Sequence, residues 1–392
     1  MFKSRRGSIT VAGLLELRSE DELRQLTGIK WAKYGAEVLP AWVADMDMKP
    51  PRFAIDAARD LIERADVGYN FAAPARLPEL FSSWQERHHG WTPDPSQVAA
   101  FTDVLHAIEV TLWLHTSPEA SVVVFTPIYP PFLRALHGAK RELIDVPLDR
   151  PGWRLSAERL EQAIGDNTEA ILLCNPHNPT GRMFDASERQ AIAEVVVERG
   201  LVLISDEVWA DITHPGAAHV PMATVNQQVA AQTITITSAS KTFNLAGLRC
   251  AVAHIGDGLR SRFDELPEHF LGAVNSVGAE VTAACWERGD AWAQELRSFL
   301  TERRSQVLSR LETDLPIVGT HQPQATYLAW LDFTATNLGP DPASWLLENA
   351  KVALSHGPDF GVHGAGFARL NFATSPVLLD DILNRMVDAL DY

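Results

Sequence analysis

Short apolar runs rich in β-branched residues alternate with longer amphipathic stretches between about residues 100 and 255. The runs lie at residues 122–125, 170–174, 201–205 and 233–237, and residues 186–199 form one of the amphipathic stretches. Runs of this length are typical of buried strands, and the longer stretches are typical of helices. The pattern predicts a parallel sheet with crossover helices, whose ligands would bind at the carboxyl ends of the strands.

The C-terminal third of the chain follows a different pattern. It opens with a charged helical segment at residues 291–311 and continues into strand-like pieces at 325–331 and 368–372, which indicates a smaller α+β domain. No internal repeat or low-complexity linker sets the first residues apart, so we expect them to join this smaller domain. The predicted division is a large domain of residues 50–290 and a small domain of residues 1–49 with 291–392.

Composition and charge narrow the class of partner. The 392 residues are 46% hydrophobic, which is enough for one large core and a smaller one. Lys and Arg number 34 against 50 Asp and Glu, and the net charge of −16 opposes binding to nucleic acid or an anionic membrane. No apolar stretch reaches the roughly 20 residues of a membrane-spanning helix. The three cysteines are widely spaced, as in a reducing compartment, so we expect a cytoplasmic protein that acts on a small molecule.

Residues 237–244, Thr-Ser-Ala-Ser-Lys-Thr-Phe-Asn, place Lys241 just past a predicted strand among small hydroxyl residues. Burial lowers the pKa of a lysine, and the neutral amine can then form a Schiff base with a carbonyl group. Taken alone, the segment fits a solvated loop lysine slightly better.

Residues 174–181, Cys-Asn-Pro-His-Asn-Pro-Thr-Gly, follow another predicted strand. The prolines and the glycine predict a rigid turn, and the Asn amides can hydrogen-bond a phenolic oxygen or a carboxylate above the sheet. The alternative is an ordinary Asn-Pro turn, but so long a string rarely arises by chance.

Two charged residues stand in apolar surroundings. Asp206 ends the apolar run 201–205, and a buried carboxylate there needs a cation such as a protonated pyridine nitrogen. Arg369 lies within a strand-like stretch and suits bidentate capture of a substrate carboxylate. Taken alone, Asp206 fits a helix N-cap equally well, and Arg369 fits a structural salt bridge about as well.

These four segments occur together, and with them the chain resembles the pyridoxal 5′-phosphate (PLP)-dependent aminotransferase superfamily of fold type I from about Trp31 onward. The resemblance is closest to the branch of cystathionine β-lyases and C–S lyases. Its motifs stand here as Leu39-Pro-Ala-Trp-Val-Ala-Asp-Met-Asp47, Gly68-Tyr69, Pro127-Ile-Tyr-Pro-Pro-Phe132, residues 174–181 with His177, and Ser240-Lys-Thr-Phe-Asn-Leu-Ala-Gly-Leu248. The resemblance implies an α/β fold whose large domain has a mostly parallel seven-stranded sheet, with a smaller α+β domain.

The resemblance also implies which residues hold the cofactor. Lys241 would carry PLP as a Schiff base and shuttle protons, and Asp206 would keep the pyridine nitrogen protonated, which makes the ring an electron sink. Asn178 would hydrogen-bond the phenolic oxygen, and Tyr129 would stack on the ring. The remaining cofactor-binding residues would be Ser238, Ser240 and Arg249, with the backbone amides of Val104 and Leu105 completing the phosphate site at a helix N-terminus.

For the substrate, the resemblance places Arg369 on the α-carboxylate of an amino acid, with Asn178 and the backbone near Ala44 beside it. Tyr69 matches a tyrosine that reaches across a dimer interface to the partner's cofactor and substrate, where the resemblance implies a catalytic role beside Lys241. The resemblance therefore implies a homodimer in which each site needs two subunits.

Two positions depart from the family pattern. Trp209 stands where a His or Tyr usually donates to the phenolic oxygen. An indole N–H can still donate and bind there, but its bulk would reshape the pocket, which leaves the reaction open. Asp103 puts an acidic residue where the phosphate would approach, unless it caps the helix and faces away.

The activity that the resemblance implies is α,β-elimination from an S-substituted L-cysteine or cystathionine, giving a thiol, pyruvate and ammonia. The alternatives are an aminotransferase, a diverted lyase that releases an aldehyde after decarboxylation or deamination, and a PLP-binding regulatory partner. No metal site is expected, because His88-His89 lacks a third ligand at metal spacing and is expected at the surface.

Overall fold

The computed structural model describes residues 13–69, 71–267 and 270–390, and its central element is a seven-stranded sheet in the order β2-β8-β7-β6-β5-β3-β4. Strands β3 to β7 are parallel to one another, whereas β8 is antiparallel to both β7 and β2. The α/β class and the mostly parallel seven-stranded sheet are thereby confirmed. The bounds are β2 (Val98–Phe101), β3 (Ser121–Thr126), β4 (Glu142–Pro147), β5 (Thr168–Cys174), β6 (Val202–Asp206), β7 (Thr233–Thr237) and β8 (Ala251–Ile255).

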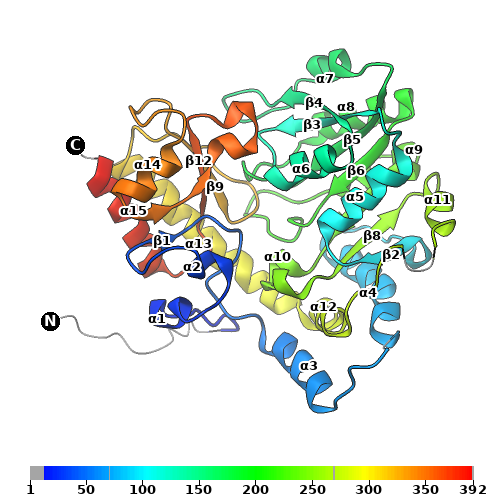
Figure 1. Ribbon diagram of the computed structural model, residues 1–392, viewed down its shortest axis with the longest axis horizontal. Coiled ribbons are helices and arrows are strands. Elements are labelled where there is room, and N and C mark those ends of the chain that lie inside the picture. Colours follow the sequence, from blue (N-terminus) through cyan, green and yellow to red (C-terminus); the bar gives the residue numbers. More distant parts are fainter. Residues whose placement is uncertain (1–12, 70, 268–269, 391–392) are drawn as a thin grey trace.

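Both faces of this sheet are covered by helices, which explains why its strands are apolar without interruption. Neighbouring residues of a strand point to opposite faces. On β3, Val122 and Val124 pack into one core with α5 (Val104–His115) and α6 (Pro130–Gly138). Val123 and Phe125 pack into a second core on the other face. Figure 1 shows the helices that lie on the two faces of the sheet. The helices that contribute to this second core are α7 (Ala157–Ala163), α8 (Ala186–Arg199) and α9 (Gln227–Ala231).

Helix α8 begins and ends where its sequence predicts. The carboxylate of Asp185 accepts a hydrogen bond from the backbone N–H of Glu188 at 3.0 Å, and the carboxylate of Glu188 accepts one from the N–H of Asp185 at 2.8 Å. This reciprocal pair satisfies two donors that the first helical turn leaves free. Gly200 ends the helix at φ 64°, in the left-handed region that glycine adopts without strain. The crossover helix predicted at residues 186–199 is confirmed.

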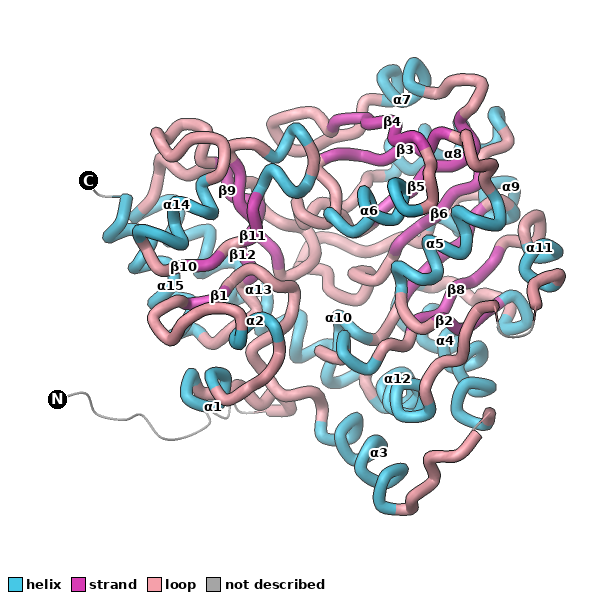
Figure 2. The backbone as a smooth tube through the Cα atoms, viewed as in Figure 1, coloured by secondary structure: helices cyan, strands magenta, loops and turns pink. Residues whose placement is uncertain are grey.

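Two smaller sheets lie apart from the large one (Figure 2). Strands β11 (Ser355–His356), β12 (Phe367–Asn371) and β9 (Leu328–Asp332) form an antiparallel sheet. Strand β1 (Leu39–Pro40) pairs in parallel with β10 (Val352–Ala353), so a segment near the N-terminus meets a segment of the C-terminal third. The predicted domain boundaries at residues 50 and 290 stay a prediction.

The remaining elements are helices that surround these sheets. The predicted charged helix at residues 291–311 lies within α13 (Asp290–Asp314). The other α-helices are α1 (Glu20–Arg24), α2 (Ile29–Ala32), α3 (Arg52–Glu63), α4 (Ala72–His89), α10 (Ser240–Phe243), α11 (Arg260–Asp264), α12 (Ser276–Arg288), α14 (Pro342–Asn349) and α15 (Pro376–Leu390). The 3-10 helices are η1 (Pro95–Gln97), η2 (Met222–Thr224), η3 (Ala246–Leu248), η4 (Gly357–Phe360) and η5 (Val362–Gly364).

The expectations of no membrane-spanning helix and of reduced cysteines can be compared with the structure. A bilayer could not be crossed by any helix within the described ranges, since none is both long and apolar enough. Cys174, Cys250 and Cys285 are buried free thiols. The cytoplasmic location stays a prediction.

The expected surface position of His88-His89 is wrong. The side chain of His89 is only 5% exposed, and its Nε2 lies 3.0 Å from a carboxylate oxygen of Asp211. The ring of His88 stacks on Trp84 with 3.9 Å between the ring centroids. The two histidine side chains of this turn are therefore mostly buried, because Trp84 and Asp211 supply partners, the latter 122 residues from His89 in the sequence.

Candidate active site

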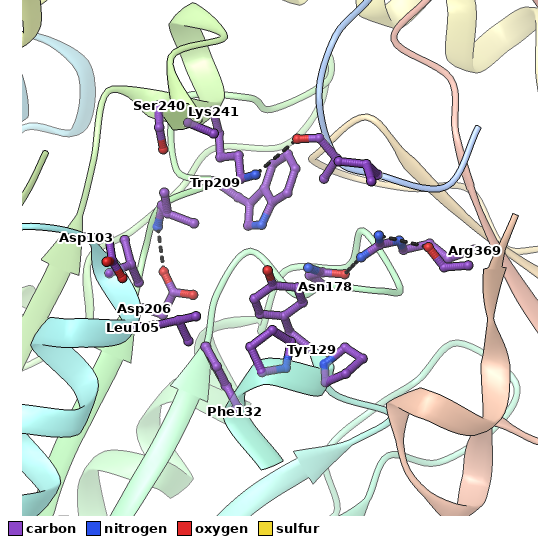
Figure 3. Close-up of a pocket in the computed structure, with 18 of the residues that line it drawn as sticks. Asp103, Leu105, Tyr129, Phe132, Asn178, Asp206, Trp209, Ser240, Lys241 and Arg369 are labelled. Carbon is purple, nitrogen blue, oxygen red and sulfur yellow. Dashed lines mark hydrogen bonds between the residues drawn. The ribbon is translucent and has the colours of Figure 1, made fainter. Parts of the chain in front are cut away.

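The carboxyl ends of β3, β5, β6 and β7 open into a cavity of about 430 Å³ (Figure 3). These ends meet because the strands are parallel, so each segment that follows a strand enters the cavity from the same edge of the sheet. Of the sequence-predicted site residues, those that line the cavity are Ala44, Val104, Leu105, Tyr129, Asn178, Asp206, Trp209, Ser238, Ser240, Lys241, Arg249 and Arg369.

Asp206 ends β6 with its carboxylate buried at the edge of the cavity. One oxygen accepts a hydrogen bond from the backbone N–H of Val208 at 3.0 Å, and the other lies 3.8 Å from the thiol of Cys174. Among the described residues, no basic side chain forms an ion pair with it, and burial raises its pKa to about 7. No helix starts at this position, which excludes the N-cap alternative. Asp206 is a buried carboxylate that lacks a cationic partner.

Lys241 lies in α10, the short helix that follows β7. Its Nζ donates a hydrogen bond to the carbonyl oxygen of Ala44 at 3.0 Å, and the hydroxyl of Tyr327 donates to the same oxygen at 2.8 Å. Burial lowers the pKa of the amine. The amine points into the cavity (Figure 3), so the solvated loop lysine is excluded.

Arg369 and Asn178 form the opposite side of the cavity (Figure 3). One guanidinium nitrogen of Arg369 donates to the side-chain oxygen of Asn178 at 2.8 Å, and another donates to the carbonyl of Trp42 at 2.9 Å and to the hydroxyl of Ser355 at 3.0 Å. Its Nε is buried without a partner among the described residues. Burial lowers the pKa of this guanidinium to about 10. No carboxylate within the described ranges pairs with it, so the salt-bridge alternative finds no support.

The turn that carries Asn178 is held tightly against the chain around Pro323. Gly181 adopts φ 68°, and a Cβ there would lie 2.7 Å from the Cβ of Pro323 and 2.9 Å from the carbonyl oxygen of Ala325. Only glycine fits this approach without displacing the backbone. The side-chain oxygen of Asn175 accepts a hydrogen bond from the N–H of Phe184 at 3.1 Å, which closes the turn from within. The rigid turn predicted from residues 174–181 is present.

The far end of the cavity is formed by the N-terminus of α5, where Val104 and Leu105 lie. Asp103 caps this helix by accepting a hydrogen bond from the N–H of His106 at 3.0 Å. Its other oxygen pairs with Arg249, whose side chain is 60% exposed. Asp103 is thus a helix cap, as one of the two alternatives predicted. Its side chain does not face away, however, because it lines the cavity and pairs with Arg249.

Ser238 and Ser240 shape the turn between β7 and α10. The hydroxyl of Ser238 donates to the carbonyl of Cys250 at 2.6 Å and accepts from the N–H of Ser240 at 3.1 Å. These bonds hold the turn that bears Lys241 against the start of β8. Both serines line the cavity near Arg249.

Trp209 and Tyr129 face each other across the centre of the cavity (Figure 3). The indole of Trp209 is buried, packs edge-on against Tyr327 with 4.8 Å between the ring centroids, and lies 5.4 Å from the Nζ of Lys241. Figure 3 shows its ring nitrogen turned into the cavity. The indole N–H is therefore placed to donate to a bound molecule.

This chain matches the family model described as aminotransferase class I and II over residues 43–386. The chain belongs to this family. Its relatives include cystathionine β-lyase PatB of Bacillus subtilis, which is 32% identical over 373 residues, with 92% of this chain and 96% of the relative covered. The predicted membership of the aminotransferase superfamily, near its cystathionine β-lyase branch, is confirmed.

Solved structures of the same fold include members that contain PLP. Cystalysin from Treponema denticola, which contains a PLP cofactor, matches with a TM-score of 0.90 and 26% identity, covering 97% of this chain and 99% of that chain. The PLP-bound C–S lyase from Staphylococcus hominis matches with a TM-score of 0.87 and 26% identity, covering 96% and 98%. Together with PatB, these proteins support a PLP-dependent C–S lyase, and the prediction that the chain is an enzyme is confirmed.

The residues of the cavity fit this family's cofactor. Asp206 is a buried carboxylate without a cation, which a protonated pyridine nitrogen would supply. Lys241 offers an amine whose pKa is lowered by burial. The N-terminus of α5 and the guanidinium of Arg249 offer donors to a phosphate at the opposite end.

Tyr69 stands apart from the other predicted site residues. Its side chain is 100% exposed and does not line the cavity of its own subunit. It lies between α3 and α4, where its ring stacks on that of Phe71 with 6.5 Å between the centroids. The role across a dimer interface stays a prediction.

Sequence reasoning missed several cavity residues. Tyr327 lies behind the cavity lining and shares the carbonyl of Ala44 with Lys241; it gave no signal because it stands in an ordinary strand-like stretch. Trp42 lies inside the motif of residues 39–47, yet its contact with Arg369 spans 327 residues. Further polar, charged or aromatic cavity residues outside the motifs are Lys33, Tyr34, Arg134, Ser355, His356, Asp359 and Phe360.

Proposed function

We propose that this protein is a PLP-dependent C–S β-lyase that cleaves an S-substituted L-cysteine or cystathionine to a thiol, pyruvate and ammonia. One observation carries the proposal: a single cavity holds the amine of Lys241, the buried unpaired carboxylate of Asp206 and the guanidinium of Arg369 without a carboxylate partner. The cofactor would supply an aldehyde to Lys241 and a protonated ring nitrogen to Asp206, and the amino acid would supply a carboxylate to Arg369.

We assign the residues around the cofactor as follows. Lys241 would bind its aldehyde, and Asp206 would pair with its ring nitrogen. Tyr129 would stack on the ring, while Asn178 and Trp209 would donate to its phenolic oxygen. When bound, this group supplies an electron sink for charge that develops at the substrate Cα. The phosphate would lie among Ser238, Ser240, Arg249 and the amides of Val104 and Leu105.

The chain's own side chains then act on the substrate. Arg369 binds the α-carboxylate, helped by Asn178 and the backbone at Ala44, and so fixes the orientation of the Cα–H bond. The amine of Lys241 would be free once the amino group of the substrate replaced it at the aldehyde carbon. This amine, whose pKa burial lowers, could then take the proton from Cα and hold it at Nζ. Loss of the thiolate from Cβ follows, and water converts the remaining three-carbon unit into pyruvate and ammonia.

We also propose a homodimer in which Tyr69 reaches the cavity of the partner subunit. The full exposure of Tyr69 supports this role, and Phe71 beside it is 79% exposed. Large aromatic side chains that stay exposed on an isolated subunit are typical of interfaces. The substrate is a small amino acid, and the net charge of −16 argues against a nucleic-acid partner.

The experiment is to measure pyruvate and free thiol when the purified, PLP-loaded protein meets L-cystathionine and a series of S-alkyl-L-cysteines. Equal amounts of the two products are expected from the wild type. The Lys241→Ala variant should produce neither above background, whereas Lys140→Ala, which replaces an exposed lysine outside the cavity, should match the wild type. A change in cofactor absorbance without pyruvate would instead favour transamination or aldehyde release, with Trp209 the first residue to replace. Binding of PLP with no turnover of any amino acid would favour the regulatory role.

A further inference from the structure

Two basic side chains line the cavity without a part in holding the cofactor or the α-carboxylate. Lys33 lies just after α2, and Arg134 lies in α6. The inference drawn from them rests on the proposed lyase function. In that function the cysteine sulfur carries a second group, which must extend from Cβ toward the open side of the cavity while Arg369 holds the α-carboxylate.

Trp42 joins Lys33 to the part of the cavity where the substrate would bind. Its carbonyl oxygen accepts hydrogen bonds from Arg369 at 2.9 Å and from Ser355 at 2.7 Å. The ammonium of Lys33 lies 4.3 Å from the centroid of its indole ring and 5.1 Å from that of Tyr34. One residue therefore contacts Arg369 through its backbone and holds the ammonium of Lys33 through its side chain.

The aromatic contact holds the position of the Lys33 charge without neutralising it, since a cation over a ring keeps its full charge. Within the described ranges, neither Lys33 nor Arg134 forms an ion pair with a carboxylate. The acidic residues that line the cavity are Asp103, which pairs with Arg249, then Asp206 at the end of β6, and Asp359.

Asp359 lies directly before Phe360, whose ring centroid lies 5.0 Å from the guanidinium carbon of Arg369. The basic side chains that line the cavity outnumber its acidic ones, in a chain whose net charge is −16; they are Lys33, Arg134, Lys241, Arg249 and Arg369. A cavity with the sign opposite to that of its protein attracts anions selectively.

We propose that Lys33 binds a carboxylate at the end of the sulfur-linked group of the substrate, and that Arg134 adds to the attraction. The preferred substrates are thus S-substituted cysteines whose leaving thiol is itself an acid. The rings of Trp42 and Phe360 offer apolar surface to the methylene groups between the sulfur and that carboxylate. Where such a group also carries an ammonium, Asp359 is the acid available to it.

The test compares two substrates that differ in charge and hardly in size, S-(2-carboxyethyl)-L-cysteine and S-(2-carbamoylethyl)-L-cysteine. The quantity measured is the ratio of their kcat/KM values, from thiol and pyruvate release by the PLP-loaded protein. Because the intrinsic reactivity of the two leaving thiols is the same for every variant, a change of this ratio between variants reports on the side chain replaced.

The wild type should prefer the carboxylate, and Lys33→Gln should lower the ratio about fivefold, the effect of one ion pair at an exposed site. Arg134→Gln should lower it as well, Lys33→Arg should keep it, and Lys140→Gln, an equal change of charge outside the cavity, should leave it unaltered. An equal ratio in the wild type and Lys33→Gln would overturn this inference while the lyase function stands. Absence of thiol and pyruvate with both substrates would overturn the two together.

Discussion

The carboxylate of Asp103 pairs with the guanidinium of Arg249 at the N-terminus of α5, where a phosphate would have to approach both. An ion pair at this place has two opposing effects. It orients Arg249 toward the cavity, and it places a negative charge beside the proposed phosphate site.

We expect the repulsion to dominate, so that Asp103→Asn binds PLP more tightly, by about fivefold in Kd. Asparagine keeps the helix cap, because its side-chain oxygen can still accept from the N–H of His106. The measurement is a titration of cofactor-free protein with PLP, followed by Schiff-base absorbance. Asp94→Asn is the matched control, since Asp94 caps η1 outside the cavity by accepting from Ser96 at 2.8 Å. Weaker binding by Asp103→Asn would mean that orientation of Arg249 outweighs repulsion.

The buried carboxyl of Asp206 makes the stability of the cofactor-free protein depend on pH. Its pKa is about 7 in the folded chain and 3.8 in the absence of burial. Between these values the folded state holds a proton that the unfolded state has released, so stability falls as pH rises from about 4 to 7. The loss attributable to this group is on the order of 4 kcal/mol.

Urea unfolding at pH 5 and pH 8 measures this effect. Between pH 5 and pH 8 the wild type should lose free energy of unfolding, and Asp206→Asn should lose less of it, because the variant has no carboxyl to ionise. Asp66→Asn, at an exposed position, should follow the wild type. Equal pH dependence in the wild type and Asp206→Asn would show that this carboxyl is ionised in the folded chain at pH 5.

The glycine of the Asn178 turn can be tested against a glycine of nearly the same backbone conformation. Gly181 and Gly200 have φ 68° and 64°, but a Cβ at Gly200 meets nothing within 4 Å. Gly200→Ala should therefore lower the free energy of unfolding only by the backbone strain, which is about 1 kcal/mol. Gly181→Ala adds a clash with Pro323 and Ala325, and should cost about 2 kcal/mol or more in the free energy of urea unfolding. Similar losses for both variants would mean that the chain around Pro323 moves aside freely.

Tyr69 can be tested by mixing two inactive variants. If Tyr69 acts in the partner's cavity, a hybrid dimer of Lys241→Ala and Tyr69→Ala subunits contains one site with both residues intact. Random exchange in a symmetric dimer then restores about a quarter of wild-type activity. The measurement is thiol release before and after subunits are exchanged in mild denaturant. No recovery, with hybrid dimers demonstrated by mass spectrometry, would place the action of Tyr69 in its own subunit.

Local patterns in the sequence were enough to predict the core of the fold and the segments that enter the cavity. The apolar runs at 122–125 and 170–174 lie within β3 and β5. They could be predicted because strands that are covered on both faces consist of apolar residues without polar alternation. Lys241 and Asp206 were found because each directly follows such a run, and parallel strands end at one edge of a sheet. These are properties of contiguous residues, which a sequence displays directly.

Tertiary structure alone decided the contacts between distant segments. The burial of His89 depends on Asp211, and the shared hydrogen bonds at Ala44 depend on Tyr327, which lies 283 residues away. The contact between Trp42 and Arg369, which lies 327 residues away, likewise follows from how the segment around β1 packs against the C-terminal third of the chain. No local pattern encodes such meetings, because they arise from the packing of whole elements and the satisfaction of buried polar groups. The sequence by itself thus determined the sheet and the chemistry at its edge, while the packing of the two ends of the chain decided the charges that a substrate meets.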